Sequence, residues 1–349
     1  MTKVAIIIPT MNRPDFMLRQ FEFYELMKSL HPVYISDSSN PENAEKIKSG
    51  IKKFKNFEIT YQWAPPGKDC LYQLLPLVKE KYCIQMGDDD IMIPETISEC
   101  ADFLESHPGY ETCAGKQVNI RFRKEDYIKP YGVVASQTSP HGRSIEDEDM
   151  LMRVKNFWSD PFFICFVVTR VEVEKEIRNI TKHFSLTDHV MEFLLVSLLI
   201  ISGKSKVLDK LGYVMQISDN RYSFVQELII DVILASDFHD KWSICEKGFS
   251  EIIRKKGVPE EEILKIVKWI FFAYLVRQFS LENDWLAVGR KGSKPVRQSL
   301  SKKLRIFVSH LPFLKSIYYK YNSPSDVARP ESKYYGDFKA VKDFLEKSQ

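Results

Sequence analysis

The sequence of 349 residues has no apolar run long enough to cross a bilayer. Its longest later run covers residues 193–201, far short of the roughly 20 residues that a membrane-spanning helix needs. Near the amino terminus, the apolar run 4–8 ends before Pro9 and is too short for a secretory signal. These absences predict a cytoplasmic protein in which residues 193–201 form a buried helix.

Signatures of several large enzyme and metal-binding classes are also missing. The six cysteines show neither CxxC spacing nor a Cys/His cluster, which excludes a zinc finger and predicts buried, reduced thiols. The motifs GxxxxGK[ST], GxGxxG, HExxH and GxSxG do not occur. The net charge is only +3, and no basic recognition element suggests a nucleic-acid partner.

The first 120 residues instead alternate between short apolar strands and amphipathic helices. Expected strands are residues 4–8, 33–36, 57–63, 82–86 and 112–120, and the expected helices are residues 15–30, 70–81, one from Asn40-Pro41 and one from Pro94 to about His107. This rhythm predicts an α/β fold with an open, mostly parallel sheet flanked by helices.

The remainder of the chain is expected to form the second half of the α/β domain and a helical region. Residues 121–144 form a long loop or small hairpin, followed by a helix (147–157), a strand (162–168) and a helix (187–201). The acidic run 145–150 is interpreted as helix capping. Helices are expected at 225–236, 240–256 and 259–281. We therefore divide the chain into an α/β domain (1–220, with halves 1–120 and 121–220) and a helical carboxyl-terminal region (221–349).

Three of the expected strands end in polar residues that would meet at one edge of the sheet. The first runs into Pro9 to Arg13, the second ends at Asp37, and the fourth ends in Gly87-Asp88-Asp89-Asp90. In extended chain Asp88 and Asp90 point the same way and Asp89 points elsewhere, which suits Mg²⁺ or Mn²⁺ shared with phosphate oxygens. The alternative is a solvated acidic turn that caps the next helix.

Residues 3–105, with the segments KVAIIIPTMNRP, VYISDSS and YCIQMGDDDIMIPETI, resemble the nucleotide-sugar half of family-2-like glycosyltransferases with the Rossmann-like GT-A fold. The resemblance implies that Thr10 and Arg13 line the nucleotide pocket, beside Pro9 and Asn12. It also implies that Asp37 contacts the nucleobase. Asp88 would lie near the ribose or diphosphate with Asp89 beside it, and Asp90, with Asp88, would bind the metal. The family's usual Asn-x-Gly and Ala-Arg-Asn run is missing, so Lys68 and Asp69 are expected to take over those contacts.

The resemblance also implies that residues 1–220 are the catalytic domain, with residues 121–220 as its acceptor half. It further implies an inverting reaction, whose catalytic base follows the sixth strand. Thr187-Asp188 matches the family's (E/T)D motif, so Asp188 is the candidate base that deprotonates the acceptor hydroxyl. The alternative is that Thr187 or Asp188 only caps the following helix, and Glu192 is a weaker candidate base. Other readings of the whole chain are a sugar-nucleotidyltransferase and a non-catalytic scaffold of the same fold.

Between Trp285 and Ser325 the chain has no acidic residue, while lysines and arginines interleave with apolar and aromatic residues. This basic amphipathic segment suits the surface of an anionic membrane, or else it is a solvated helix packed on the catalytic domain. The expected partners are a nucleotide-diphosphate sugar, a glycan or lipid-linked acceptor, and peripherally the inner face of the cytoplasmic membrane.

Overall fold

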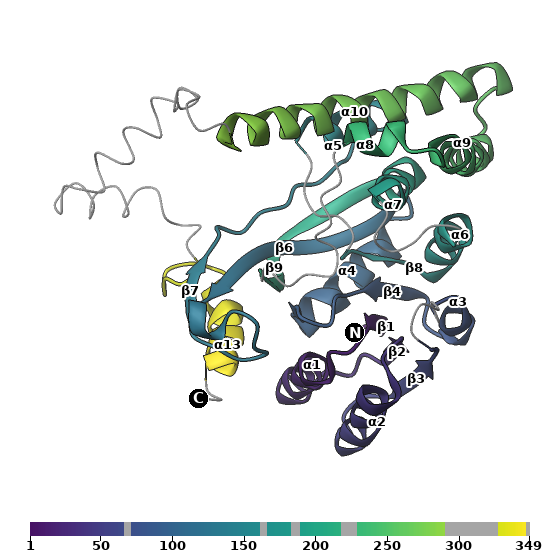
Figure 1. Ribbon diagram of the computed structural model, residues 1–349. Helices are drawn as coiled ribbons and strands as arrows, with labels where there is room; N and C mark the ends of the chain where they lie inside the picture. Colours follow the sequence, from purple (N-terminus) through teal and green to yellow (C-terminus); the bar gives the residue numbers. More distant parts are fainter. Residues whose placement is uncertain (66–70, 161–165, 183–188, 218–228, 290–326, 347–349) are drawn as a thin grey trace.

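Four parallel strands form the amino-terminal part of the sheet (Figure 1). The computed structural model describes residues 1–65, 71–160, 166–182, 189–217, 229–289 and 327–346. Strands β1 (Val4–Thr10), β2 (Val33–Asp37), β3 (Ile59–Trp63) and β4 (Tyr82–Gln85) lie in the order β3-β2-β1-β4. Ile6 of β1 packs on one side of the sheet and Ile7 on the other, which explains the continuous apolar run in the sequence.

The helices between these strands begin and end at residues that the sequence marks. They are α1 (Pro14–Leu26), α2 (Pro41–Gly50), α3 (Leu71–Leu74) and α4 (Pro94–Ser106). Asn40 caps α2 by accepting a hydrogen bond from the Asn43 amide, as predicted. The expected helix 70–81 is wrong in length: after α3 only a 3-10 turn, Leu75–Leu77, follows. Pro76 interrupts it, because proline lacks the amide hydrogen that a continuing α-helix needs.

The second part of the sheet mixes parallel and antiparallel strands. Strands β6 (Tyr110–Phe122) and β9 (Lys204–Gln216) are long and parallel, whereas β8 (Val168–Arg170) runs antiparallel to both β4 and β6. The short β5 (Ile91–Met92) closes the edge against β9. The strand expected over 162–168 begins only at Val168, and residues 161–165 lie outside the described part of the chain.

Strand β9 was not predicted, and its pairing with β6 depends on two glycines. A Cβ on Gly115 would lie 2.5 Å from the Gly212 Cα, so neither strand tolerates a side chain at this crossing. β7 (Val134–Gln137) folds back on β6, with the 3-10 turn Lys124–Asp126 between them. Of the two alternatives for residues 121–144, the small hairpin is therefore the one observed.

A second core lies under a layer of helices (Figure 1). This layer comprises α5 (Met150–Ser159), α6 (Val171–Thr181), α7 (His189–Ser202), α8 (Ile229–Leu234), α9 (Phe238–Lys255) and α10 (Glu260–Gly289). Asp149 caps α5, which confirms the interpretation of the acidic run 145–150. Within the described ranges, no helix is both long and apolar enough to cross a membrane.

The last helix, α13 (Tyr335–Glu346), returns to the amino-terminal half instead of joining the helical layer (Figure 1). Its buried face belongs to the same core as α1, and the rings of Phe344 and Phe23 lie 5.3 Å apart. The Leu345 carbonyl accepts a hydrogen bond from the Gly132 amide of the hairpin. Residues 327–346 therefore complete the first core, although the sequence had placed them with the helical region.

Candidate functional site

The polar ends of β1, β2 and β4 meet at one edge of the sheet, as the sequence predicts. Thr10, the last residue of β1, pairs with Asp37, the last residue of β2. On the other side of β1, Ile7 pairs with Gln85 at the end of β4, so the acidic run that follows β4 lies beside the loop that follows β1. This edge is where open α/β sheets bind their ligands.

The acidic run 88–90 forms a turn, here called the acidic turn, whose carboxylates bind an arginine. Asp88 Oδ1 lies 2.8 Å from Arg13 Nη1, and Asp89 Oδ2 lies 3.0 Å from Arg13 Nη2. Thr10 donates its hydroxyl hydrogen to Asp88 Oδ2 at 2.7 Å. The expectation that Asp89 points away from Asp88 was wrong, because the two residues form a turn, where the alternation of an extended strand does not apply.

Asp90 faces the opposite side, towards β9. Its Oδ1 accepts a hydrogen bond of 3.0 Å from the Gln216 amide, and its side chain is buried. Asp89 Oδ1 and Asp90 Oδ2 nevertheless converge on one point, since each lies 3.2 Å from the position that a Cβ on Gly87 would occupy. Glycine at position 87 thus leaves space between the two carboxylates.

The electrostatics of the turn are those of a buried charge cluster with one partly exposed cation. Burial raises the pKa of Asp88, and Asp89 adds to this, whereas the Arg13 charge and the Thr10 hydrogen bond oppose it. Burial lowers the pKa of Arg13, but the charges of Asp88 and Asp89 outweigh that effect and raise it. The Arg13 side chain is 29% exposed, while its guanidinium is held between the two carboxylates and the Phe16 ring.

The end of the site beside β1 and β2 is built around Asn12 and Asp37. Asn12 has a φ of 58°, a left-handed conformation that asparagine tolerates. Its amide donates to Ser39 Oγ at 2.7 Å and its side chain accepts from the Asn40 amide at 2.9 Å. Asp37 is fully buried, and its carboxylate accepts hydrogen bonds from the Ser39 amide and the Tyr61 hydroxyl. Asp37 thus holds the turn that follows β2.

The donor atoms of the acidic turn fit a divalent cation shared with a diphosphate. Among the described residues, no group of three or more His, Cys, Asp or Glu side chains forms a metal site by itself. A cation that binds nucleotides takes one or two carboxylates and completes its shell with phosphate oxygens and water, so a full protein cage is not required. Asp89 and Asp90 offer converging oxygens, whereas both oxygens of Asp88 accept bonds from Thr10 and Arg13.

Several residues behind the turn were missed by the sequence analysis. Arg19 and Gln20 on α1, and Gln216 at the end of β9, hydrogen-bond to the turn or to each other. Tyr61 on β3 was missed as well. Polar residues at buried helix positions are the signal that could have found Arg19 and Gln20, but their burial becomes visible only in the fold.

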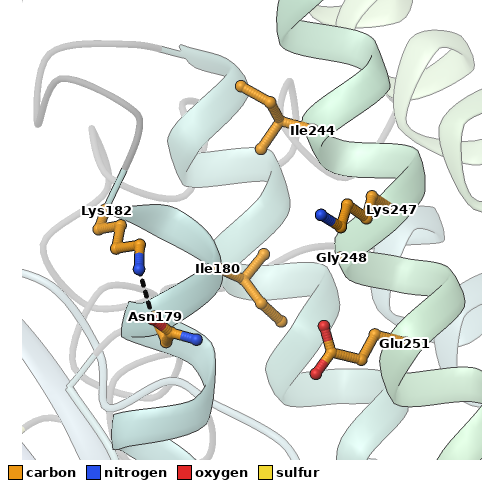
Figure 2. A pocket seen from close by; sticks show the side chains of 7 residues that line it. All are labelled: Asn179, Ile180, Lys182, Ile244, Lys247, Gly248 and Glu251. Atoms are coloured by element: carbon orange, nitrogen blue, oxygen red, sulfur yellow. Dashed lines mark hydrogen bonds between the residues drawn. The ribbon is translucent and has the colours of Figure 1, made fainter.

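Other expected site residues lie outside the described part of the chain. These are Lys68, Asp69 and Asp188, together with most of the basic segment 285–325. A hollow of about 280 Å³ lies between α6 and α9 (Figure 2). Figure 2 shows Ile180 and Gly248 at the close approach of the two helices, with Lys182 donating to Asn179. This hollow holds none of the expected site residues.

Comparison with known proteins identifies the fold. No family model and no curated protein matches the sequence. The crystal structure of S. aureus TarS residues 1–349 covers all of this chain and 92% of its own length, with a TM-score of 0.53 at 13% identity. Its complex with UDP-GlcNAc gives a TM-score of 0.53 at 15% identity, covering 100% of this chain and 93% of that one.

The mannosyltransferase PcManGT from Pyrobaculum calidifontis, in complex with GDP-Man and Mn²⁺, is similar at a TM-score of 0.43 and 12% identity, covering 99% of this chain and 88% of that one. The likeness to TarS shows the fold: a mostly parallel sheet flanked by helices, with a helical carboxyl-terminal part. It confirms the expected GT-A-like α/β architecture.

Proposed function

We propose that the chain is a glycosyltransferase that takes a sugar from a nucleotide-diphosphate sugar and transfers it to a hydroxyl of a surface-polysaccharide or glycoconjugate acceptor. The observation that carries this proposal is the meeting of three strand ends, where Thr10, Arg13 and the acidic turn are bonded to one another. The fold adds support, because TarS 1–349 shares it and has been crystallised with UDP-GlcNAc.

The partly exposed side chain of Arg13 suits the diphosphate of such a donor, and the segment from Pro9 to Asn12 suits the nucleoside. Asp37 would contribute to nucleobase binding by holding Tyr61 and the turn at Ser39 in place. Asp90 and Asp89, with Asp88 beside them, would hold Mn²⁺ or Mg²⁺. When bound, such a cation neutralises charge on the leaving diphosphate.

An inverting reaction needs one carboxylate that removes the proton of the attacking acceptor hydroxyl. Asp188 is our proposed base, since it immediately precedes α7 in the sequence and matches the position of the family's motif. Lys68 and Asp69 are proposed donor contacts. The acceptor would approach between the hairpin at β7 and the helical layer.

We also propose peripheral association with an anionic membrane. The basic segment 285–325 begins within the last turns of α10, whose exposed residues include apolar ones: Phe272 is 63% exposed and Val276 53% exposed. Leu234 of the neighbouring α8 is 75% exposed. Exposed aromatic and aliphatic side chains next to a basic segment suit the headgroup region of a bilayer.

The membrane proposal is tested by co-sedimentation with phosphatidylglycerol vesicles and with neutral phosphatidylcholine vesicles. The protein should sediment with the anionic vesicles, and Phe272→Ser should weaken this binding several-fold. Ile128→Ser is the matched control, because Ile128 is 60% exposed on the hairpin. Equal binding by both variants and the wild type would exclude the α10 face as the docking surface.

The central test of function is a screen of sugar nucleotides for hydrolysis in the presence of Mn²⁺ or Mg²⁺. Release of a nucleoside diphosphate identifies a glycosyltransferase, whereas release of pyrophosphate from a nucleoside triphosphate and a sugar phosphate identifies a nucleotidyltransferase. Asp188→Asn should remove turnover while the donor still binds, and Asp231→Asn, at an exposed position of α8, should behave as wild type. A chain that binds donors without any turnover would be a scaffold.

A further inference from the structure

The α1 face behind the acidic turn is polar although it is buried. Arg19 is 1% exposed and Gln20 is fully buried, and both side chains point to the turn that follows β4. A core position on a helix that packs against a sheet is ordinarily apolar, because a buried polar side chain needs hydrogen-bond partners. The partners of these two residues show what they do.

Arg19 uses its guanidinium fork to connect three parts of the chain. Nη2 donates to the Asp89 carbonyl oxygen of the acidic turn. Nη1 donates to Gln216 Oε1 at 2.6 Å, at the end of β9, and to the Pro130 carbonyl of the hairpin. Its charge also lies near the carboxylates of Asp89 and Asp90, so Arg19 is a second cation beside the turn.

The two glutamines complete the arrangement on either side of Arg19. Gln20 Nε2 donates to the carbonyl oxygens of Gly87 and Asp90, with 2.5 Å to the latter, and so spans the acidic run from its first residue to its last. Gln216 donates its amide hydrogen to Asp90 Oδ1 and its side-chain Nε2 to the Lys129 carbonyl at 3.1 Å. The backbone of the turn is thus fixed from α1, and the carboxylate of Asp90 from β9.

This arrangement does not optimise stability alone. Arg19 Nε, Gln20 Oε1 and the Tyr24 hydroxyl, all on α1, have no hydrogen-bond partner among the described residues. Each buried polar atom without a partner lowers the free energy of unfolding, so an apolar core here would be more stable. Polar side chains at these positions are explained by the atoms that they hold in place.

We propose that Arg19 is a positioning residue, which fixes the acidic turn so that the Asp89 and Asp90 carboxylates meet one cation, and that Gln216 links this turn to the hairpin. The inference rests on the proposed function, because it assumes that the acidic turn binds a cation and a diphosphate. Arg19 itself touches neither. It acts through the Asp89 backbone and through Gln216.

The test uses Arg19→Lys in the full-length chain. Lysine keeps the positive charge, but its single ammonium group cannot reproduce the guanidinium fork that spans Asp89 and Gln216. Mn²⁺ binding is measured by electron paramagnetic resonance, with the cation alone and with UDP, GDP, CDP or ADP. Circular dichroism and thermal unfolding verify that each variant is folded.

Arg153→Lys is the matched control. Arg153 is also a buried arginine, 7% exposed, whose guanidinium donates to backbone carbonyls, including those of Ile200 at 3.0 Å and Glu148 at 2.8 Å. It lies on α5 in the helical layer and not at the acidic turn. Both variants lose the same kind of buried hydrogen bonds, so a difference between them reports on position.

Arg19→Lys should weaken Mn²⁺ binding about 10-fold or more, as substitutions that disturb the residues orienting metal ligands do, while Arg153→Lys stays within about twofold of wild type. Equal affinity of Arg19→Lys and wild type, or an equal loss in Arg153→Lys, overturns the inference. If Arg19→Lys does not fold, Gln216→Leu decides: weaker Mn²⁺ binding supports the inference, and unchanged binding overturns it.

A wild-type protein that binds neither Mn²⁺ nor any nucleoside diphosphate contradicts the proposed function, and the inference with it. A wild type that binds, together with an Arg19→Lys variant that binds equally, contradicts the inference only. The two failures are therefore distinguishable.

Discussion

Replacing Arg13 with glutamine removes the cation that the acidic turn clasps. The ion pairs of 2.8 Å to Asp88 and 3.0 Å to Asp89 are lost, and Asp88, whose side chain is only 7% exposed, loses the charge that lowers its pKa most. A charge pair about 4 Å apart is worth about 4 kcal/mol at an effective dielectric constant of about 20, and desolvation offsets part of it. Because Arg13 is 29% exposed, we expect a net loss of about 2 kcal/mol in the free energy of unfolding.

Such a loss lowers the unfolding midpoint by about 3 °C, because a chain of 349 residues has an unfolding entropy of about 2.1 cal/mol/K per residue. Mn²⁺ should restore more stability to Arg13→Gln than it adds to wild type, because in wild type the cation competes with Arg13 for the Asp89 carboxylate. A ligand present at about 100 times its dissociation constant adds about 2.7 kcal/mol, so the recovery is measurable. The assay is thermal unfolding with Mn²⁺ and with EDTA.

Arg170→Gln is the control for this prediction. Arg170 is 21% exposed and pairs with Glu111 at 3.1 Å, far along the chain from the acidic turn. Loss of this ion pair should lower the unfolding midpoint, and Mn²⁺ should stabilise Arg170→Gln by no more than it stabilises wild type. The reasoning is refuted if Arg13→Gln unfolds within about 1 °C of wild type, or if Mn²⁺ stabilises both variants equally.

Three further outcomes follow from the geometry. Asn12→Gly should fold and keep more stability than Asn12→Ala in urea titrations, because only glycine adopts the φ of 58° without strain; equal stability would contradict the role of that conformation. Burial lowers the pKa of His31, whose Nδ1 accepts a hydrogen bond from the Val4 amide. As the pH drops below about 6.5, the unfolded state therefore binds a proton before the folded state does, and the free energy of unfolding falls. A His31→Gln variant should show a shallower fall between pH 7.5 and 5.5, whereas a His107→Gln variant, changed at an exposed position, should not. Gly115→Ala should lower the unfolding midpoint sharply, or prevent folding, and a midpoint equal to wild type would mean that β6 and β9 do not approach as closely as 2.5 Å implies.

The amino-terminal half of the fold was predictable because its signals are local. Apolar runs with flanking proline and asparagine located β1, β2 and α2 within a few residues. Strand β9 was missed, because residues 204–216 alternate poorly and depend on the parallel partner β6 and on the Gly115–Gly212 crossing for their conformation. The return of α13 to the first core depends on contacts with α1 and the hairpin, which no local pattern announces.

The candidate site was predictable where it follows strand ends and not where it depends on tertiary contacts. Thr10, Arg13 and Asp88 are brought together as expected. The predicted direction of the Asp89 side chain was wrong, because the chain after β4 forms a turn and is not extended. Arg19 and Gln216 lie 197 positions apart in the sequence, so only the fold reveals that they hold the same turn.

The central claim is that the strand-end crevice binds a nucleoside diphosphate together with a divalent cation. Isothermal titration calorimetry with UDP, GDP, CDP and ADP tests it directly, each in Mn²⁺ and in EDTA, for wild type and for Asp90→Asn. The account predicts that at least one nucleotide binds wild type in Mn²⁺, that EDTA abolishes or strongly weakens this binding, and that Asp90→Asn weakens it about 10-fold or more. Binding that is equally tight in EDTA, or an Asp90→Asn variant that binds as wild type does, would contradict it.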